Sequence, residues 1–136
     1  YLGTVAAADG ERTVLGAACK RFDIQRWVML EGDRYAEQET TAWYAPLPSI
    51  DQATYIQMQR HFHALSNFGP ELTEAYLKIP GFPMAYESVR YAEGMAIKSS
   101  YLVTELATRD APAGIYSIPE GFTKKENYSV RQLQHR

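Results

Sequence analysis

Two helical segments, set off by prolines, divide a chain that otherwise has the pattern of β-strands. Pro46 and Pro48 end the first run of strand-like sequence, and residues 51–67 follow with helical periodicity. Pro70 suits the first position of a second helix, and Pro80 ends it because the residue before a proline is pushed out of the α region. The order of strands, two helices and strands predicts an α+β fold, because a parallel sheet would need more crossover helices.

Turn residues separate the strand-like segments. In residues 1–47, Asp9-Gly10 is a hairpin dipeptide, and residues 31–33 (Glu-Gly-Asp) form a second turn between apolar runs. After the helices, segments 82–91 and 94–108 flank a third turn. We therefore expect an antiparallel sheet of about six strands with the two helices inserted mid-chain and packed on one face.

The first helix has an apolar stripe. Ser49 or Asp51 can cap its N-terminus. Four apolar side chains fall within about 80° on a helical wheel. They are Tyr55, Met58, Phe62 and Leu65. This stripe predicts which side of the helix lies on the sheet.

Length and charge limit the domain organisation and the partners. A chain of 136 residues can bury a single core, and we expect one domain over residues 1–125 followed by a polar tail over 126–136. The sequence begins "YLGTV", without Met and already strand-like, so we expect N-terminal elements to be missing. A net charge of −2 gives no general attraction to nucleic acid.

No group of residues forms a catalytic or metal-binding pattern. His61 and His63 would point about 160° apart on a helix, so they cannot share a metal ion, and we expect Phe62 between them to be buried. No serine lies in a G-x-S-x-G context. Cys19 is the only cysteine, and we expect a small buried hydrophobe; the alternative is an exposed thiol that pairs between chains. The sequence predicts a protein that is not an enzyme and has no cofactor.

Aromatic and apolar residues are in surplus. The chain has ten tyrosines, and segments 82–91 and 94–108 carry apolar side chains on both parities. A sheet with one face in water does not need so many apolar side chains. Either both faces are covered, or one face lines an apolar cavity.

Four short motifs resemble an uncharacterised family of exported bacterial proteins. They are a G-x-x-C strand at 16–19, a Trp-containing strand ending in proline at 43–46, a G-x-P entry to a hairpin at 81–83, and an apolar x-P-x-G closing motif at 115–122. In this order they cover most of residues 13–125. The family has a lipoprotein-carrier-like half-barrel.

The resemblance implies a curved antiparallel sheet with the helices against its concave side. It also implies an extracytoplasmic location, in the periplasm, the outer membrane or the extracellular space. In the carrier proteins this shape holds the acyl chains of lipoproteins. The family has no established activity to assign to a residue here.

Two functions fit these observations. The first is a non-catalytic module that binds a lipid, an acylated protein or another apolar ligand between sheet and helices. Its candidate lining is Trp27, Trp43, Met58, Phe62, Phe82, Met84, Tyr86 and Tyr101. The second is a structural or assembly protein that forms homo-oligomers or filaments through sheet edges and aromatic contacts.

Overall fold

A computed structural model describes residues 1–47, 49–115 and 117–123. The chain divides into two units, Tyr1–Leu106 and Ala107–Arg136, and each is described by itself. The predicted tail, 126–136, lies outside the described residues.

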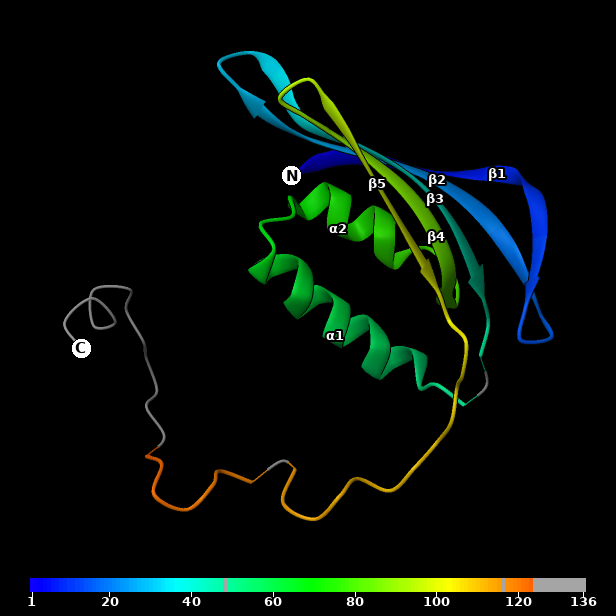
Figure 1. Ribbon diagram of the computed structural model, residues 1–136, viewed down its shortest axis with the longest axis vertical. Coiled ribbons are helices and arrows are strands. Elements are labelled where there is room, and N and C mark those ends of the chain that lie inside the picture. Colours follow the sequence, from blue (N-terminus) through cyan, green and yellow to red (C-terminus); the bar gives the residue numbers. More distant parts are fainter. Residues whose placement is uncertain (48, 116, 124–136) are drawn as a thin grey trace. The chain divides into compact units, whose positions relative to one another are not determined.

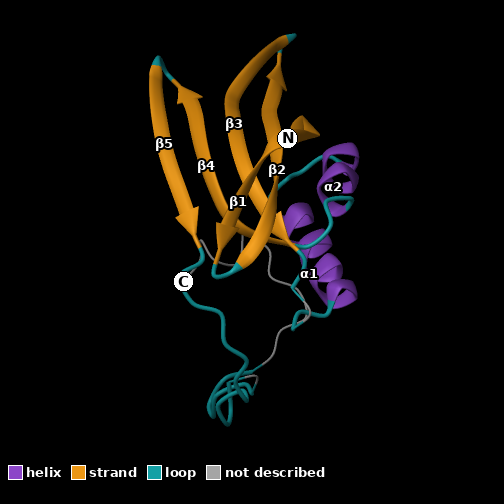
Figure 2. Cartoon of the chain, turned by 90° about the vertical axis from the view of Figure 1, so that its right-hand side faces the viewer, coloured by secondary structure: helices purple, strands orange, loops and turns teal. Residues whose placement is uncertain are grey.

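The first unit is an antiparallel sheet with two helices, which confirms the predicted α+β class. The strands lie side by side in chain order (Figures 1 and 2). The elements are β1 (Leu2–Val14), β2 (Ala17–Leu30), β3 (Asp33–Ala45), α1 (Gln52–Leu65), α2 (Pro70–Leu77), β4 (Phe82–Ala92) and β5 (Met95–Leu102). Every neighbouring pair is antiparallel. Both helices connect β3 to β4 and pack on one face of the sheet, here called the helix face (Figure 1).

The described residues form five strands where the sequence predicted about six. The predicted hairpin at Asp9-Gly10 was wrong, because β1 continues through it to Val14. The pairing of β1 with β2 shifts between Ala8 and Glu11, and Gly10 has a φ of 138°. Asp9-Gly10 is therefore an irregularity inside one strand, since glycine tolerates a backbone conformation that a bulge requires.

The helix boundaries follow the predicted stereochemistry. Asp51, one of the two predicted caps, is the N-cap of α1 and accepts a 3.2 Å hydrogen bond from the Ala53 N–H. Thr54 donates its hydroxyl to the same carboxylate, and this bond is the main reason that the pKa of Asp51 is lowered. Pro70 is the first residue of α2, as predicted.

Helix α2 lies against β1 and β2. Gly3 makes this approach possible, because a Cβ there would lie 3.0 Å from Leu72 Cδ1 and 2.1 Å from the Gln25 carbonyl oxygen. The loop before α2 is tied to the start of β1 by a 2.7 Å hydrogen bond from the Gly69 N–H to the Tyr1 carbonyl. Gly3 thus fixes how closely the N-terminal half of α2 meets the sheet.

Helix α1 does not present its predicted stripe to the sheet. Met58, Phe62 and Leu65 are 62%, 60% and 86% exposed, whereas His63 is only 4% exposed. Among the four predicted residues Tyr55 does contact the sheet, with its ring 5.5 Å from that of Phe82. The expected burial of Phe62 was wrong.

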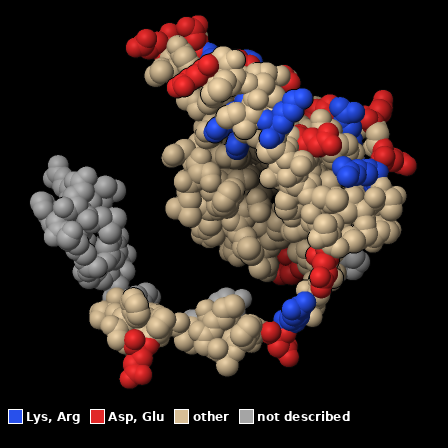
Figure 3. Space-filling view, viewed as in Figure 1, with Lys and Arg blue, Asp and Glu red and all other residues tan. Residues whose placement is uncertain are grey.

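The position of α2 explains this rotation of α1. Arg60 hydrogen-bonds Glu74 on α2, so α2 lies on the Arg60 side of α1. At 100° per residue, the exposed side chains of Met58, Phe62 and Leu65 point roughly the opposite way. The space-filling view shows few charged side chains over α1 (Figure 3).

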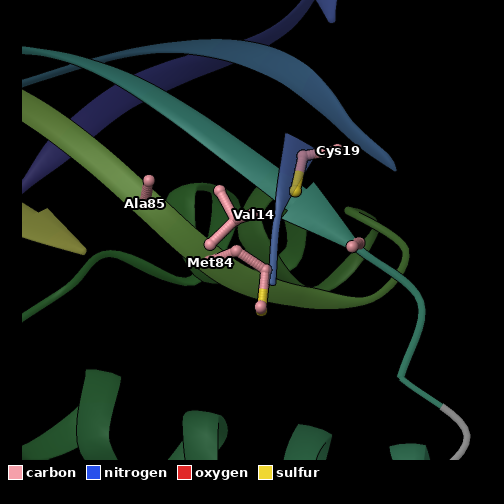
Figure 4. Packing of buried hydrophobic residues seen from close by; sticks show 5 residues of the cluster. Val14, Cys19, Met84 and Ala85 are labelled. Carbon is pink, nitrogen blue, oxygen red and sulfur yellow. The ribbon is translucent and has the colours of Figure 1, made fainter. Parts of the chain in front are cut away.

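Each face of the sheet carries its own buried cluster. On the helix face Ile24, Ala42 and Tyr44 pack with Ile79, the residue that follows α2. On the opposite face a second cluster joins the end of β1 to the starts of β2 and β4. Its buried members are Val14, Cys19, Ala45, Met84 and Ala85 (Figure 4). The two clusters explain why strand residues of both parities are apolar, because both faces are partly covered.

In the second unit the described residues, 107–115 and 117–123, contain turns but no helix or strand. Ile115 donates its N–H to the Pro112 carbonyl at 3.2 Å, and Phe122 donates to Pro119 at 3.2 Å. Prolines and glycines are frequent in this segment, and such residues favour turns over helices and strands.

Candidate functional site

An open groove of about 650 Å³ runs between α2 and the first two strands, on the helix face. Its sheet side is formed by Val5, Ala7 and Phe22. Its helix side is formed by Pro70, Glu71, Glu74, Ala75, Lys78 and Ile79. The volume falls in the range of about 300–1,000 Å³ that is usual for small-molecule sites. We call this hollow the α2 groove.

Small residues on one parity of β1 create the α2 groove. Gly3, Val5 and Ala7 alternate along the strand, so all three point to the helix face. At Gly3 the side chain of Leu72 closes the space between helix and strand. Near Ala7 the space between helix and strand stays open, because Ala7 and Ala75 both have small side chains. The groove therefore has a low, apolar floor.

Charged residues line the outer rim of the α2 groove. Glu71, Glu74 and Lys78 lie on α2 beside the apolar floor. Arg60 hydrogen-bonds Glu74, which lowers the pKa of that carboxyl, and Lys78 adds a weaker effect in the same direction. Glu74 is consequently charged at neutral pH, and the rim offers both a carboxylate and an ammonium group.

Behind the groove floor lies a buried aromatic cluster. Tyr44 packs edge-on against the floor residue Phe22, with ring centroids 5.7 Å apart. Burial raises the pKa of both Tyr44 and Tyr76, so both phenols are neutral at physiological pH. His63 lies 5.1 Å from the Tyr76 ring, and its pKa is lowered, mainly by burial. Phe22 thus connects the groove floor to a buried aromatic cluster.

A second hollow, of about 670 Å³, lies on the opposite face of the sheet. Its lining is mainly polar and includes Arg21, Asp23, Gln25, Glu39, Thr41, Glu87, Lys98 and Ser100. Arg21 and Asp23 already pair at 2.9 Å. Polar residues on the face away from the helices are expected for an antiparallel sheet with one wet side. This hollow is therefore the weaker candidate for an apolar ligand.

The structure divides the eight predicted lining residues between the two faces. Five lie on the helix side of the sheet, away from α2. Of these, Met58 is exposed on α1, and Tyr86 and Tyr101 stack with ring centroids 4.9 Å apart. Phe62 is exposed beside Met58, and Phe82 contacts Tyr55 of α1.

The other three lie elsewhere. Trp43 and Met84 belong to the cluster on the face opposite the helices. Trp27 lies under the Arg34 guanidinium, which is 3.8 Å from its ring centroid. The eight residues do not converge on one cavity, and none of them lines the α2 groove.

Sequence reasoning missed the α2 groove because the residues that leave its space open, such as Ala7 and Ala75, are small. The aromatic surplus drew attention to large side chains, whereas a groove forms where side chains are missing. The available signal was the alternation of Gly3, Val5 and Ala7 along the first strand. Small residues at one parity predict a close approach or a hollow on that face.

Clusters of metal ligands and membrane-spanning helices are both absent from the described part of the chain. It contains no group of three or more His, Cys, Asp or Glu side chains placed to hold a metal ion. None of its helices has the length and hydropathy needed to span a bilayer. Comparison with family models, curated proteins and solved structures finds no match to this chain.

Proposed function

We propose that this protein is a non-catalytic, extracytoplasmic module that binds a lipid or an acylated ligand in the α2 groove, between sheet and helices. The observation that carries the proposal is the apolar floor of Val5, Ala7, Phe22 and Ile79 beneath α2, open to solvent along one side. An acyl chain buried there gains about 0.8 kcal/mol for each fully covered CH₂ group.

The rim supports an amphipathic ligand over a purely apolar one. Lys78 and Glu71 stand at the outer edge of the floor, where the polar end of an acyl compound would meet water. A polar group buried without a partner costs free energy, so a ligand with one polar end fits this groove in a single orientation.

The resemblance to exported proteins with a lipoprotein-carrier-like half-barrel supports the same proposal. In that arrangement the antiparallel sheet curves, and the ligand lies between its concave face and the helices. The order of three strands, two helices and two strands is compatible with part of such a half-barrel. The proposed location outside the cytoplasm rests on this resemblance.

The test is a fluorescence titration with a dansyl-labelled fatty acid. Ala7→Phe places a ring in the groove, and because Ala7 is exposed the strand can accept it. The substitution should weaken binding by about tenfold or more, since the ring occupies the space that the ligand needs. Ala6→Phe is the matched control, because Ala6 pairs with Asp23 and points to the opposite face. Equal binding by both variants would exclude the α2 groove.

A further inference from the structure

Among the residues that the structure describes, strand β5 is an open edge of the sheet. It has one neighbour in the sheet, β4, and all eight of its residues are exposed. Its pairing with β4 runs without a register shift from Ala85 opposite Leu102 to Ala92 opposite Met95. A long, regular edge strand presents unpaired backbone groups that another strand can bind.

The hydrogen bonds of β5 identify which residues face outward. Val103 donates its N–H to the Met84 carbonyl at 2.9 Å. Because hydrogen-bonded pairs alternate along an antiparallel ladder, the backbone N–H and C=O groups of the odd-numbered residues of β5 bond to β4. The backbone N–H and C=O groups of the even-numbered residues then point away from β4, toward the open edge. These even-numbered residues are Ala96, Lys98, Ser100 and Leu102.

The other edge strand, β1, is less suited to pairing. Its register shifts between Ala8 and Glu11, and Gly10 has a φ of 138°. Irregularities of this kind interrupt the row of edge groups and discourage association. The two edges of the sheet therefore differ, and β5 is the more regular one.

We propose that β5 pairs with β5 of a second copy of this chain, antiparallel, about a two-fold axis at Ser99. In this register Ser99 lies opposite Ser99 of the second copy, and Lys98 lies opposite its Ser100. Ser100 pairs within its own sheet with Glu87. Lys98 of one copy and Glu87 of the second copy thus lie on either side of the second copy's Ser100, on the same face and two strand spacings or about 10 Å apart, and their opposite charges attract.

Charge and side-chain pairing select this register. Moving the axis by one residue to Lys98 would place two lysines opposite each other, which is destabilising. With the axis at Ser99, Ile97 lies opposite Tyr101 of the second copy on the helix face, and a β-branched residue beside an aromatic one is a favourable pair. The interface is symmetric, because the same eight-residue strand of each copy forms it.

Cysteine cross-linking of the full chain tests the register. Residues opposite each other in a non-hydrogen-bonded pair have Cα atoms about 4.5 Å apart, within the range of a disulfide. Ser99→Cys should therefore form a covalent dimer under mild oxidation. Ser100→Cys is the control. Its cysteines in the two copies are offset by two residues, about 7 Å along the strands, so they should not cross-link. The native Cys19 is buried and does not compete.

Sedimentation equilibrium of the full chain tests the interface without a cross-link. Lys98→Glu and Glu87→Lys should each weaken the dimer about tenfold or more, and the double variant should restore it, because the opposite charges face each other again. Cross-linking at Ser99 with this rescue supports the proposal. A monomer from micromolar to millimolar concentration, or equal cross-linking at Ser100, overturns it. Since β5 lies outside the α2 groove, neither result depends on ligand binding.

Discussion

Gly81 lies directly against the carbonyl group of Ala45, where the end of β3 meets the start of β4. A Cβ atom on Gly81 would be 2.5 Å from the Ala45 oxygen and 2.6 Å from its carbonyl carbon, and the φ of Gly81 is 97°. No side chain fits there, and an L-residue is strained at that φ. The Gly-Phe-Pro turn after α2 thus brings the chain back into the sheet at one fixed position.

We predict that Gly81→Ala lowers the free energy of unfolding by about 3 kcal/mol or more, because it combines a backbone clash with strain. Gly94→Ala is the matched control: Gly94 has a φ of 76°, but nothing lies within 4 Å of its Cβ position. In Gly94→Ala, backbone strain alone should lower the free energy of unfolding by about 1 kcal/mol. Urea unfolding of both variants checks this, and equal losses would contradict the contact with Ala45.

His63 should make the fold sensitive to acid. It is 4% exposed and stacked on Phe68, and its Nδ1 has no hydrogen-bond partner among the described residues. Burial lowers its pKa, and the positive charge of Arg26 lowers it further. The unfolded chain takes up a proton near pH 6.5 and the folded chain does not, so stability falls as the pH drops below about 6.5.

His63→Phe should flatten this acid dependence, because a phenyl ring stacks in the same place and cannot be protonated. The measurement is the urea midpoint between about pH 8 and pH 5, a window that spans the ordinary histidine pKa. His61→Phe, at an exposed position, provides the comparison. If both variants lose stability with acid as the native chain does, His63 is not the responsible group.

Cys19 should be unreactive in the folded protein. Cys19 is 1% exposed in a cluster with Val14 and Met84 (Figure 4), and burial raises the pKa of its thiol. Maleimide labelling should be roughly a thousandfold or more slower than in urea, because the sheet must open first. The comparison is Ala6→Cys, at an exposed position, combined with Cys19→Ser; its thiol should react quickly with maleimide in the folded protein. Fast labelling of native Cys19 would favour the exposed, reactive thiol.

Ligand affinity should rise with acyl chain length and then level off. Because the α2 groove is open along one side, about half of each CH₂ group is covered, which corresponds to about 0.4 kcal/mol and roughly fourfold for two added carbons. A series of unlabelled fatty acids that displace the dansyl probe measures this slope. Affinity that is independent of chain length would point to binding through the charged rim alone.

The strand and helix order could be predicted because local stereochemistry determines it. Asp51, Pro70 and Pro80 act within one turn of the chain, so their effects are visible in the sequence. Asp9-Gly10 is the exception. A bulge and a hairpin use the same residues there, and only the pairing with β2 distinguishes them.

The side of α1 that meets the sheet could not be predicted from its own residues. Its apolar stripe, with Met58 and Phe62, is the more hydrophobic side, yet the bond from Arg60 to α2 and the stacking of His63 on Phe68 turn another side inward. These are contacts between distant segments, and helical periodicity contains no information about them. The α2 groove was missed for the same reason, because it depends on how closely α2 approaches β1.

Methyl NMR of the full chain tests the proposed site most directly, by titrating a fatty acid into protein labelled at Ala, Ile and Val methyl groups. Val5, Ala7, Ala75 and Ile79 line the α2 groove, and their signals should shift together and saturate at one affinity. The Val89 methyls, in the polar hollow on the opposite face, should not shift. Shifts confined to Val89 or to the buried cluster around Val14, or no shift at all, would contradict ligand binding between sheet and helices.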